Sequence, residues 1–223
     1  MKHVEFKLDQ LRNDIMDLIH IVKIQFQKTK QTVISYDADL AFEVINTAKR
    51  IQILKMQIDL NCRDFLALNN PVAIDLRLIL SAFKTCESLD KIALHSKNIC
   101  NTLMKINEQI PVVLLDDFEV NKMLDRIVKM LYDIEKAFKT NDPKLAAKTY
   151  KKDKSINKVN IKSTQRSINW LEGHPEDLVM VLSLLEIIAD VDMVGDLIKN
   201  ISEGIVFHLE SKSIKNLSHQ NIG

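Results

Sequence analysis

Residues that interrupt helices are scarce in this chain of 223 residues, which has only 4 glycines and 4 prolines. Aromatic residues make up 5% of the chain, whereas apolar residues as a whole make up 46%. A low content of helix breakers combined with a large apolar fraction favours an all-α fold with a filled core. We therefore interpret the prolines as boundaries between long helices.

A surplus of charge is also missing, because 31 basic residues face 30 acidic ones and the net charge is +1. This balance gives no reason to expect binding to nucleic acid or to an anionic membrane. The chain has no uncharged apolar run of about 18 residues, so we expect no membrane-spanning helix. Its first residues lead directly into a charged helical pattern, which predicts a cytoplasmic protein without a signal peptide.

Cysteine is rare, and its three positions (Cys62, Cys86 and Cys100) contain no C-x-x-C pair. An odd number without that spacing argues against a disulfide framework or a zinc finger. We expect three ordinary packing thiols in a reducing compartment.

Apolar residues recur at spacings of three and four over six long segments, which is the pattern of amphipathic helices. The predicted helices span residues 4–31, 38–68, 72–108, 115–140, 143–171 and 178–209. Short connections between long helices are typical of antiparallel bundles. We predict an elongated pair of tandem antiparallel three-helix bundles, at 1–110 and 111–210, followed by a polar tail at 211–223.

Two of these segments, 76–107 and 178–209, are similar without a gap at an offset of 102 residues, the separation of Asp75 from Asp177. The offset also pairs Leu76 with Leu178, Asp90 with Asp192 and Asn98 with Asn200. Similarity at a fixed offset indicates an internal repeat. The two bundles therefore look like copies of one helical module.

Asp192 and Asp196 lie one helical turn apart on the edge of an apolar face. Like charges at this spacing repel each other by a few tenths of a kcal/mol, so the pair needs an explanation. A bound cation, a basic side chain of a partner, or simple emergence of this edge into water would each supply one.

Three stretches carry a resemblance to a known family. Residues 69–77, NNPVAIDLR, resemble the Q-Q-P-V-A-x-D-L-R stretch of the PhoU family. Residues 192–201, DMVGDLIKNI, are similar to its E-R-I-G-D-x-x-x-N-I signature, and residues 153–157, DKSIN, resemble its D-x-x-I-D element. The resemblance extends over essentially the whole chain and includes the duplicated three-helix module.

This resemblance implies a cytoplasmic negative regulator of phosphate uptake and of the phosphate-starvation response. Such a protein is a non-catalytic adaptor, expected to be a homodimer, that acts on the ATP-binding subunit of the phosphate transporter and on a membrane sensor histidine kinase. Alternatives are a PhoU-like subunit of another anion permease and a metal-binding or purely structural helical protein. An enzyme is disfavoured, because no histidine has the spacing of di-iron bundles and no nucleophile with a base is visible.

Some members of the family carry metal clusters on the carboxylate faces of the bundles, and such ions need several oxygen ligands. The second half offers Asp153, Asn157, Asp192, Asp196 and Asn200. In the first half Asp90 and Asn98 persist, but Leu94 replaces an acid, and Ala48 and Gln52 occupy the expected acidic positions of the second helix. We predict one divalent metal or iron site in the second bundle and none in the first. The alternative is that these acids are solvated and pair with lysines such as Lys199.

Asp75 and Arg77 are candidates for contact with a partner. The alternative is structural, since an acid in the first turn suits the helix dipole and Arg77 would then pair with Asp59 or Asp64. His95 is expected to point outward.

Overall fold

The computed structural model describes residues 2–69, 71–211 and 214, with the backbone alone for residues 2, 3 and 153–155. Every element in this part of the chain is helical, which confirms the all-α prediction. The α-helices are α1 (Lys2–Ser35), α2 (Ala38–Leu68), α3 (Ala73–Ile106), α4 (Val112–Asp117), α5 (Val120–Lys139), α6 (Pro143–Tyr150), α7 (Lys154–Gly173) and α8 (Leu178–Glu210). Two 3₁₀ turns, η1 (Lys151–Asp153) and η2 (Pro175–Asp177), precede α7 and α8.

Local capping chemistry sets several of the helix boundaries. The carboxylate of Asp37 accepts a hydrogen bond from the backbone N–H of Leu40 (2.9 Å) at the start of α2. Asp142 does the same for Leu145 (2.9 Å) at the start of α6, where Pro143 occupies the first turn. These side chains satisfy backbone donors that the helix itself leaves unpaired.

Two of the predicted helices are divided in the structure. The segment 115–140 is wrong as one helix, because α4 ends at Asp117 and α5 begins after Glu119, whose φ is 55°. The segment 143–171 is interrupted by η1. There Lys152 forms an ion pair with Asp133 of α5. The sequence at η1 is a run of charged residues without an apolar position, so no buried stripe holds a regular helix through it.

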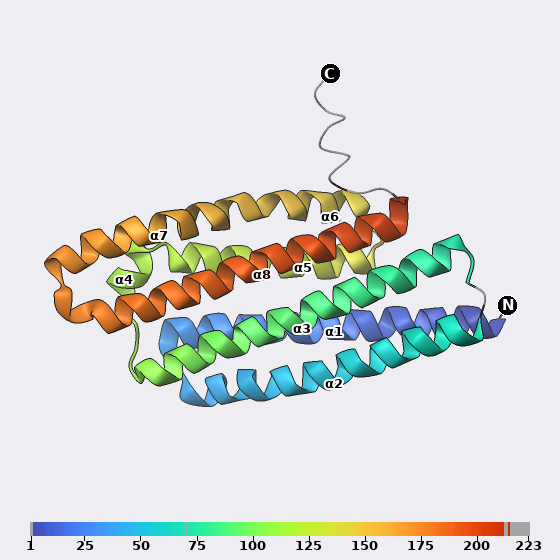
Figure 1. Ribbon diagram of the computed structural model, residues 1–223, viewed down its shortest axis with the longest axis horizontal. Helices are drawn as coiled ribbons and strands as arrows, with labels where there is room; N and C mark the ends of the chain where they lie inside the picture. The colour runs from blue at the N-terminus through green and yellow to red at the C-terminus, as the bar shows by residue number, and fades with distance from the viewer. Residues whose placement is uncertain (1, 70, 212–213, 215–223) are drawn as a thin grey trace, which may run out of the picture.

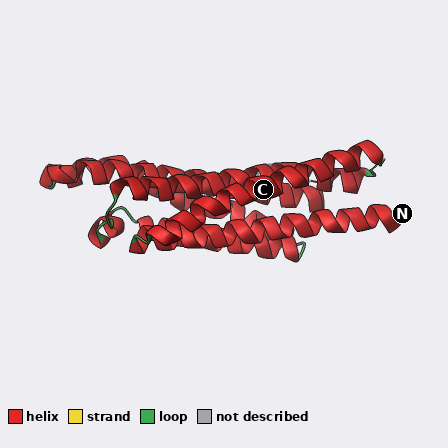
Figure 2. Ribbon diagram, turned by 90° about the horizontal axis from the view of Figure 1, so that it is seen from below, coloured by secondary structure: helices red, strands yellow, loops and turns green. Residues whose placement is uncertain are grey.

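The helices run up and down the long axis of an elongated molecule (Figures 1 and 2). Helices α1, α2 and α3 form one bundle, and α5, the α6–α7 pair and α8 form the other. Helices α3 and α8 lie antiparallel at the centre (Figure 1), where Ser81 Oγ donates a hydrogen bond to the carbonyl of Gly204 (2.8 Å). The packing of α3 against α8 joins the two bundles along their length.

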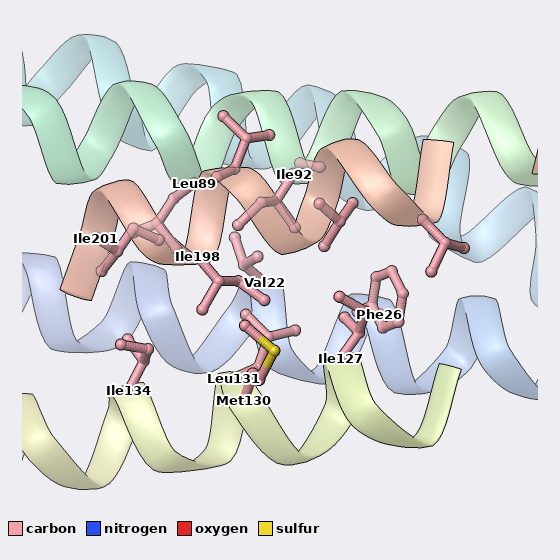
Figure 3. Close-up of a cluster of buried hydrophobic side chains, with 14 of the residues drawn as sticks. Val22, Phe26, Leu89, Ile92, Ile127, Met130, Leu131, Ile134, Ile198 and Ile201 are labelled. Atoms are coloured by element: carbon pink, nitrogen blue, oxygen red, sulfur yellow. The ribbon is translucent and has the colours of Figure 1, made fainter. Parts of the chain in front are cut away.

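The two bundles share one hydrophobic core, a feature that the sequence did not predict. Figure 3 shows side chains from both halves meeting between α1, α3, α5 and α8. They include Val22 and Phe26 of α1, Leu89 and Ile92 of α3, Ile127, Met130, Leu131 and Ile134 of α5, and Ile198 and Ile201 of α8. The buried residues of the two halves form one continuous cluster, so the halves cannot be separated without exposing apolar surface.

The three cysteines are free and buried, as predicted, with Cys62 and Cys86 in the shared core and Cys100 in a small separate cluster with Ala41 and Val44. Burial raises the pKa of Cys62 and of Cys100 to about 12 and raises that of Cys86 still further. A thiol whose pKa is that high is not a reactive nucleophile at neutral pH.

Candidate partner-binding and metal-binding site

Asp192 faces α7 and is held there by two amides. The side chain of Asn160 donates a hydrogen bond to Asp192 Oδ2 (2.7 Å). The amide of Asn157, with its nitrogen turned toward Asp192, donates to both carboxylate oxygens (2.5 and 3.3 Å). The structure thus brings together two of the predicted ligands and adds Asn160, which sequence reasoning missed although it lies one turn beyond Asn157 on the same helix face.

Asp196 has a different partner, because the ammonium of Lys199 donates to its Oδ1 (2.8 Å). The same ammonium lies 5.7 Å from the centre of the Tyr150 ring, within cation–π range. Asn200 is exposed on α8. Asp153 falls in η1, and its carboxylate lies outside the described side chains.

The partners of Asp192 and Asp196 determine whether these carboxylates can bind a metal. No group of three or more histidine, cysteine, aspartate or glutamate side chains gathers in metal-binding geometry within the described residues. Asp192 with two amides and Asp196 with an ammonium do not match a multinuclear cluster, which needs several anionic oxygens. A site for a single ion stays a prediction that depends on Asp153.

The corresponding face of the first bundle is arranged differently from the sequence-based expectation. Lys55 of α2 pairs with Asp59 (2.6 Å). The charges of both residues act on Asp90 of α3, whose pKa is raised by burial while Lys55 opposes that rise. Lys55 and Asp59, rather than Ala48 and Gln52, are thus the residues of α2 whose charges act on Asp90. This bundle has two neighbouring carboxylates rather than one, and Lys55 supplies the positive charge between them.

Two histidines form polar contacts across the boundary between the bundles. His95 Nδ1 lies 2.6 Å from Asp190 Oδ1 of α8, and these side chains are only 19% and 18% exposed. The expectation that His95 points outward is wrong, because α8 covers that face of α3. On the other side of the core, His20 of α1 lies 2.7 Å from Glu135 of α5.

Asp75 lies half-buried in the first turn of α3, next to the positive end of the helix dipole. Within the described part of the chain, Arg77 forms no ion pair with Asp59 or Asp64 of α2, and Asp59 is paired with Lys55. Instead, Arg77 lies close enough to His208 of α8 for its charge to lower the pKa of that histidine.

Exposed leucines recur at equivalent positions of the repeat. Leu76 and Leu80, at the start of α3, are 38% and 44% exposed, and Leu178 and Leu182, at the start of α8, are 49% and 52% exposed. Because α3 and α8 are antiparallel, the two pairs lie toward opposite ends of the molecule (Figure 1). Exposed apolar groups that cluster in this way are typical of protein-binding surfaces.

The fold and this surface define a class: a duplicated three-helix module fused through a common core, with similar exposed apolar groups near its two ends. The PhoU domain model matches residues 15–103 and 120–205, one match in each half. The chain belongs to the PhoU family.

Relatives match most of the chain. The phosphate-specific transport system accessory protein PhoU of Edwardsiella tarda is 24% identical over 217 residues, which cover 97% of this chain and 88% of the relative. The homolog of that accessory protein in Borreliella burgdorferi is 31% identical over 183 residues, which cover 78% of this chain and 79% of the relative. The names of both describe an accessory role in transport rather than an enzyme.

Solved structures share the fold. The crystal structure of PhoU from Pseudomonas aeruginosa superposes with a TM-score of 0.87 at 22% identity, over 93% of this chain and 99% of the other. The phosphate transport system regulatory protein PhoU from Streptococcus pneumoniae has a TM-score of 0.83 at 23% identity, over 94% and 98%. Among the described residues no helix is long and apolar enough to span a membrane.

Proposed function

We propose that this protein is a non-catalytic, cytoplasmic negative regulator of phosphate uptake and of the phosphate-starvation response. It acts as an adaptor, and as a homodimer, by binding the ATP-binding subunit of the phosphate transporter and a membrane sensor histidine kinase. The observation that carries this proposal is the match of both halves to the PhoU domain, in a chain whose full-length relatives are named accessory proteins of phosphate transport.

The surface of the chain supports a protein partner. Leu178 and Leu182 expose apolar area at the start of α8, and Leu76 and Leu80 do so at the start of α3 beside Asp75. An apolar centre with a polar edge is the usual composition of an interface core and rim. The two leucine pairs lie at opposite ends of the molecule, and we assign the pair at the start of α8, Leu178 and Leu182, to the ATP-binding subunit of the transporter.

The test is capture of partners from phosphate-rich cells by the tagged full-length protein. We expect recovery of the transporter ATP-binding subunit, and loss of that recovery when Leu178→Ser and Leu182→Ser are combined. The matched control combines Ile161→Ser and Ile168→Ser, which change two exposed apolar residues of α7 (78% and 50% exposed). The control should retain the partner.

Each outcome of the capture bears on the proposal. Recovery of the ATP-binding subunit of a different anion permease would favour the alternative of a PhoU-like subunit for that system. Recovery of no transporter or kinase component would contradict the adaptor role. Light scattering on the purified protein would test the proposed homodimer separately.

We also propose that the second bundle binds one divalent ion or iron, with Asp153 and Asp192 as the anionic ligands. Asn200 would add a neutral oxygen, Asn157 would do so only after turning its amide nitrogen away from Asp192, and Asp196 would contribute only after releasing Lys199. Elemental analysis of protein purified without chelator should find about one ion per chain. A metal-free sample whose melting temperature is unchanged by Mn²⁺, Mg²⁺ or Fe²⁺ would exclude this site.

A further inference from the structure

One end of the molecule brings together α1, α3 and α8, which come from both halves of the chain (Figure 1). The contact between Ser81 and Gly204 fixes the antiparallel register of α3 and α8. One helical turn beyond this contact, toward the end of the molecule, α3 carries Arg77 and α8 carries His208. The register therefore places these two side chains next to each other.

Both side chains contain a buried polar atom that lacks a partner. The Nε of Arg77 and the Nδ1 of His208 are inaccessible to water and make no hydrogen bond within the described structure. Leaving such an atom unpaired costs about 1–3 kcal/mol. The two residues as a whole are half-buried, so each also has atoms at the surface, and an ion would bind the buried nitrogens only when the side chains turn them outward.

The charge around these atoms is positive. Burial lowers the pKa of His208, and the charges of Arg12 on α1 and of Arg77 lower it further. No carboxylate among the described residues acts on His208 in the opposite direction. Arg12 does have an acidic neighbour, Asp9, at 3.0 Å, but that pair is largely exposed and weak.

We propose that Arg77, His208 and Arg12 form a binding site for a small tetrahedral oxyanion of the phosphate class. A guanidinium presents planar donors that match the oxygens of such an ion, and an imidazole adds a donor from another direction. A doubly charged anion would balance the two arginines and give the unpaired nitrogens an acceptor. The site goes beyond the proposed function, because binding a transporter or a kinase does not require it.

The location gives the ion a structural effect. Arg12 and Arg77 belong to the first bundle and His208 to the second, so the anion would join the two halves at this end. Binding to the folded state alone stabilises that state in proportion to the occupancy of the site.

The experiment follows the ring resonances of His208 in the full-length protein by NMR, with the signal assigned from the spectrum of His208→Gln. Sodium phosphate, sodium sulfate, glycerol phosphate and sodium acetate are titrated at equal ionic strength. We expect saturable shifts with phosphate and sulfate and no saturable shift with acetate. Arg77→Gln should weaken phosphate binding by about tenfold or more, since it removes the charged fork.

The control variant is Arg63→Gln, which removes an exposed arginine of α2 and should leave binding unchanged. Circular dichroism confirms that each variant is folded, and Arg77→Lys provides a second test in which the charge is kept but the fork is lost. Binding of glycerol phosphate as strongly as phosphate would support the site and identify phosphomonoesters as ligands. Binding of inorganic phosphate alone would support the site and identify the free ion.

Two results would overturn the proposal. The first is an equal response to acetate, which would show that any anion acts through general screening. The second is unchanged phosphate binding in folded Arg77→Gln and Arg77→Lys proteins.

Discussion

Glu135 of α5 binds two side chains of α1, Lys23 and His20, at the boundary between the bundles. Lys23 Nζ donates to its Oε2 at 2.5 Å, and these side chains are only 10% and 16% exposed. Glu135→Gln would leave the buried ammonium without a carboxylate. We expect a loss of about 2–3 kcal/mol in the free energy of unfolding, measured by urea denaturation at neutral pH.

The matched control is Glu87→Gln, which breaks the pair with Lys91 on the surface of α3 (60% and 53% exposed). An exposed pair of this kind contributes about 0.5 kcal/mol or less. Equal losses of unfolding free energy in the two variants would show that the buried Glu135 pair contributes no more stability than the exposed Glu87 pair.

The Glu135 pair should also be sensitive to acid. Burial alone would raise the pKa of Glu135, but Lys23 and His20 lower it below the ordinary 4.5 overall. A depressed carboxyl pKa contributes stability that is complete above the unfolded-state value and is lost as the pH falls through the folded-state value. The difference in stability between the wild type and Glu135→Gln should therefore shrink as the pH falls below 4.5.

At the level of single residues, the sequence predicts local roles better than long-range ones. The capping roles of Asp37 and Asp142 are readable, because their partners lie three residues away. The hydrogen bond between His95 and Asp190 and the effect of the Arg77 charge on His208 link positions 95 and 131 (208 − 77) residues apart. They depend on how α3 and α8 cross, which periodicity does not specify.

Among the helices, the antiparallel pair of α3 and α8 depends on one close approach. A Cβ added at Gly204 would lie 3.1 Å from Ser81 Oγ and 3.3 Å from Thr85 Oγ1. Gly204→Val should force α8 away from α3 and lower the free energy of unfolding by about 1–3 kcal/mol. Thermal or urea unfolding measures this change.

Gly173 is a suitable control, because a Cβ at this position would meet nothing within 4 Å. Gly173→Val should change stability by about 0.5 kcal/mol or less, since it makes no new contact. An unchanged stability in Gly204→Val would mean that the two helices can separate locally at no cost.

Helix positions were predicted well where the apolar stripe is continuous, and α2 spans the predicted residues 38–68. The prediction of one continuous helix over residues 143–171 was wrong at η1, where Lys152 forms an ion pair with Asp133 of α5. The offset of 102 residues relates α3 to α8, whereas on α2 the family resemblance pointed to Ala48 and Gln52, and the charges that act on Asp90 are those of Lys55 and Asp59.

For the whole molecule, the common core predicts that the two halves unfold together. Leu131 of α5 is fully buried in the cluster that both halves share (Figure 3). Leu131→Ala should lower the free energy of unfolding by about 3 kcal/mol. Native-state hydrogen exchange should show that amides of α1 and α8 lose protection together, as expected for one cooperative unit.

Leu68→Ala, at a side chain that is 74% exposed on α2, is the control and should change stability by about 0.5 kcal/mol or less. Loss of protection confined to α5–α8 in Leu131→Ala would contradict a shared cooperative unit. The sequence predicted the duplication but not this fusion, because an apolar stripe does not reveal which helix will cover it.

The long antiparallel contact between α3 and α8 also sets the distance between the two ends of the molecule. Helix α8 has 33 residues and is therefore about 50 Å long. The paired leucines at the starts of α3 and α8 lie toward opposite ends of this span, and the common core packs the two helices together between them. Two proteins that bound at these two ends would be held at a fixed separation.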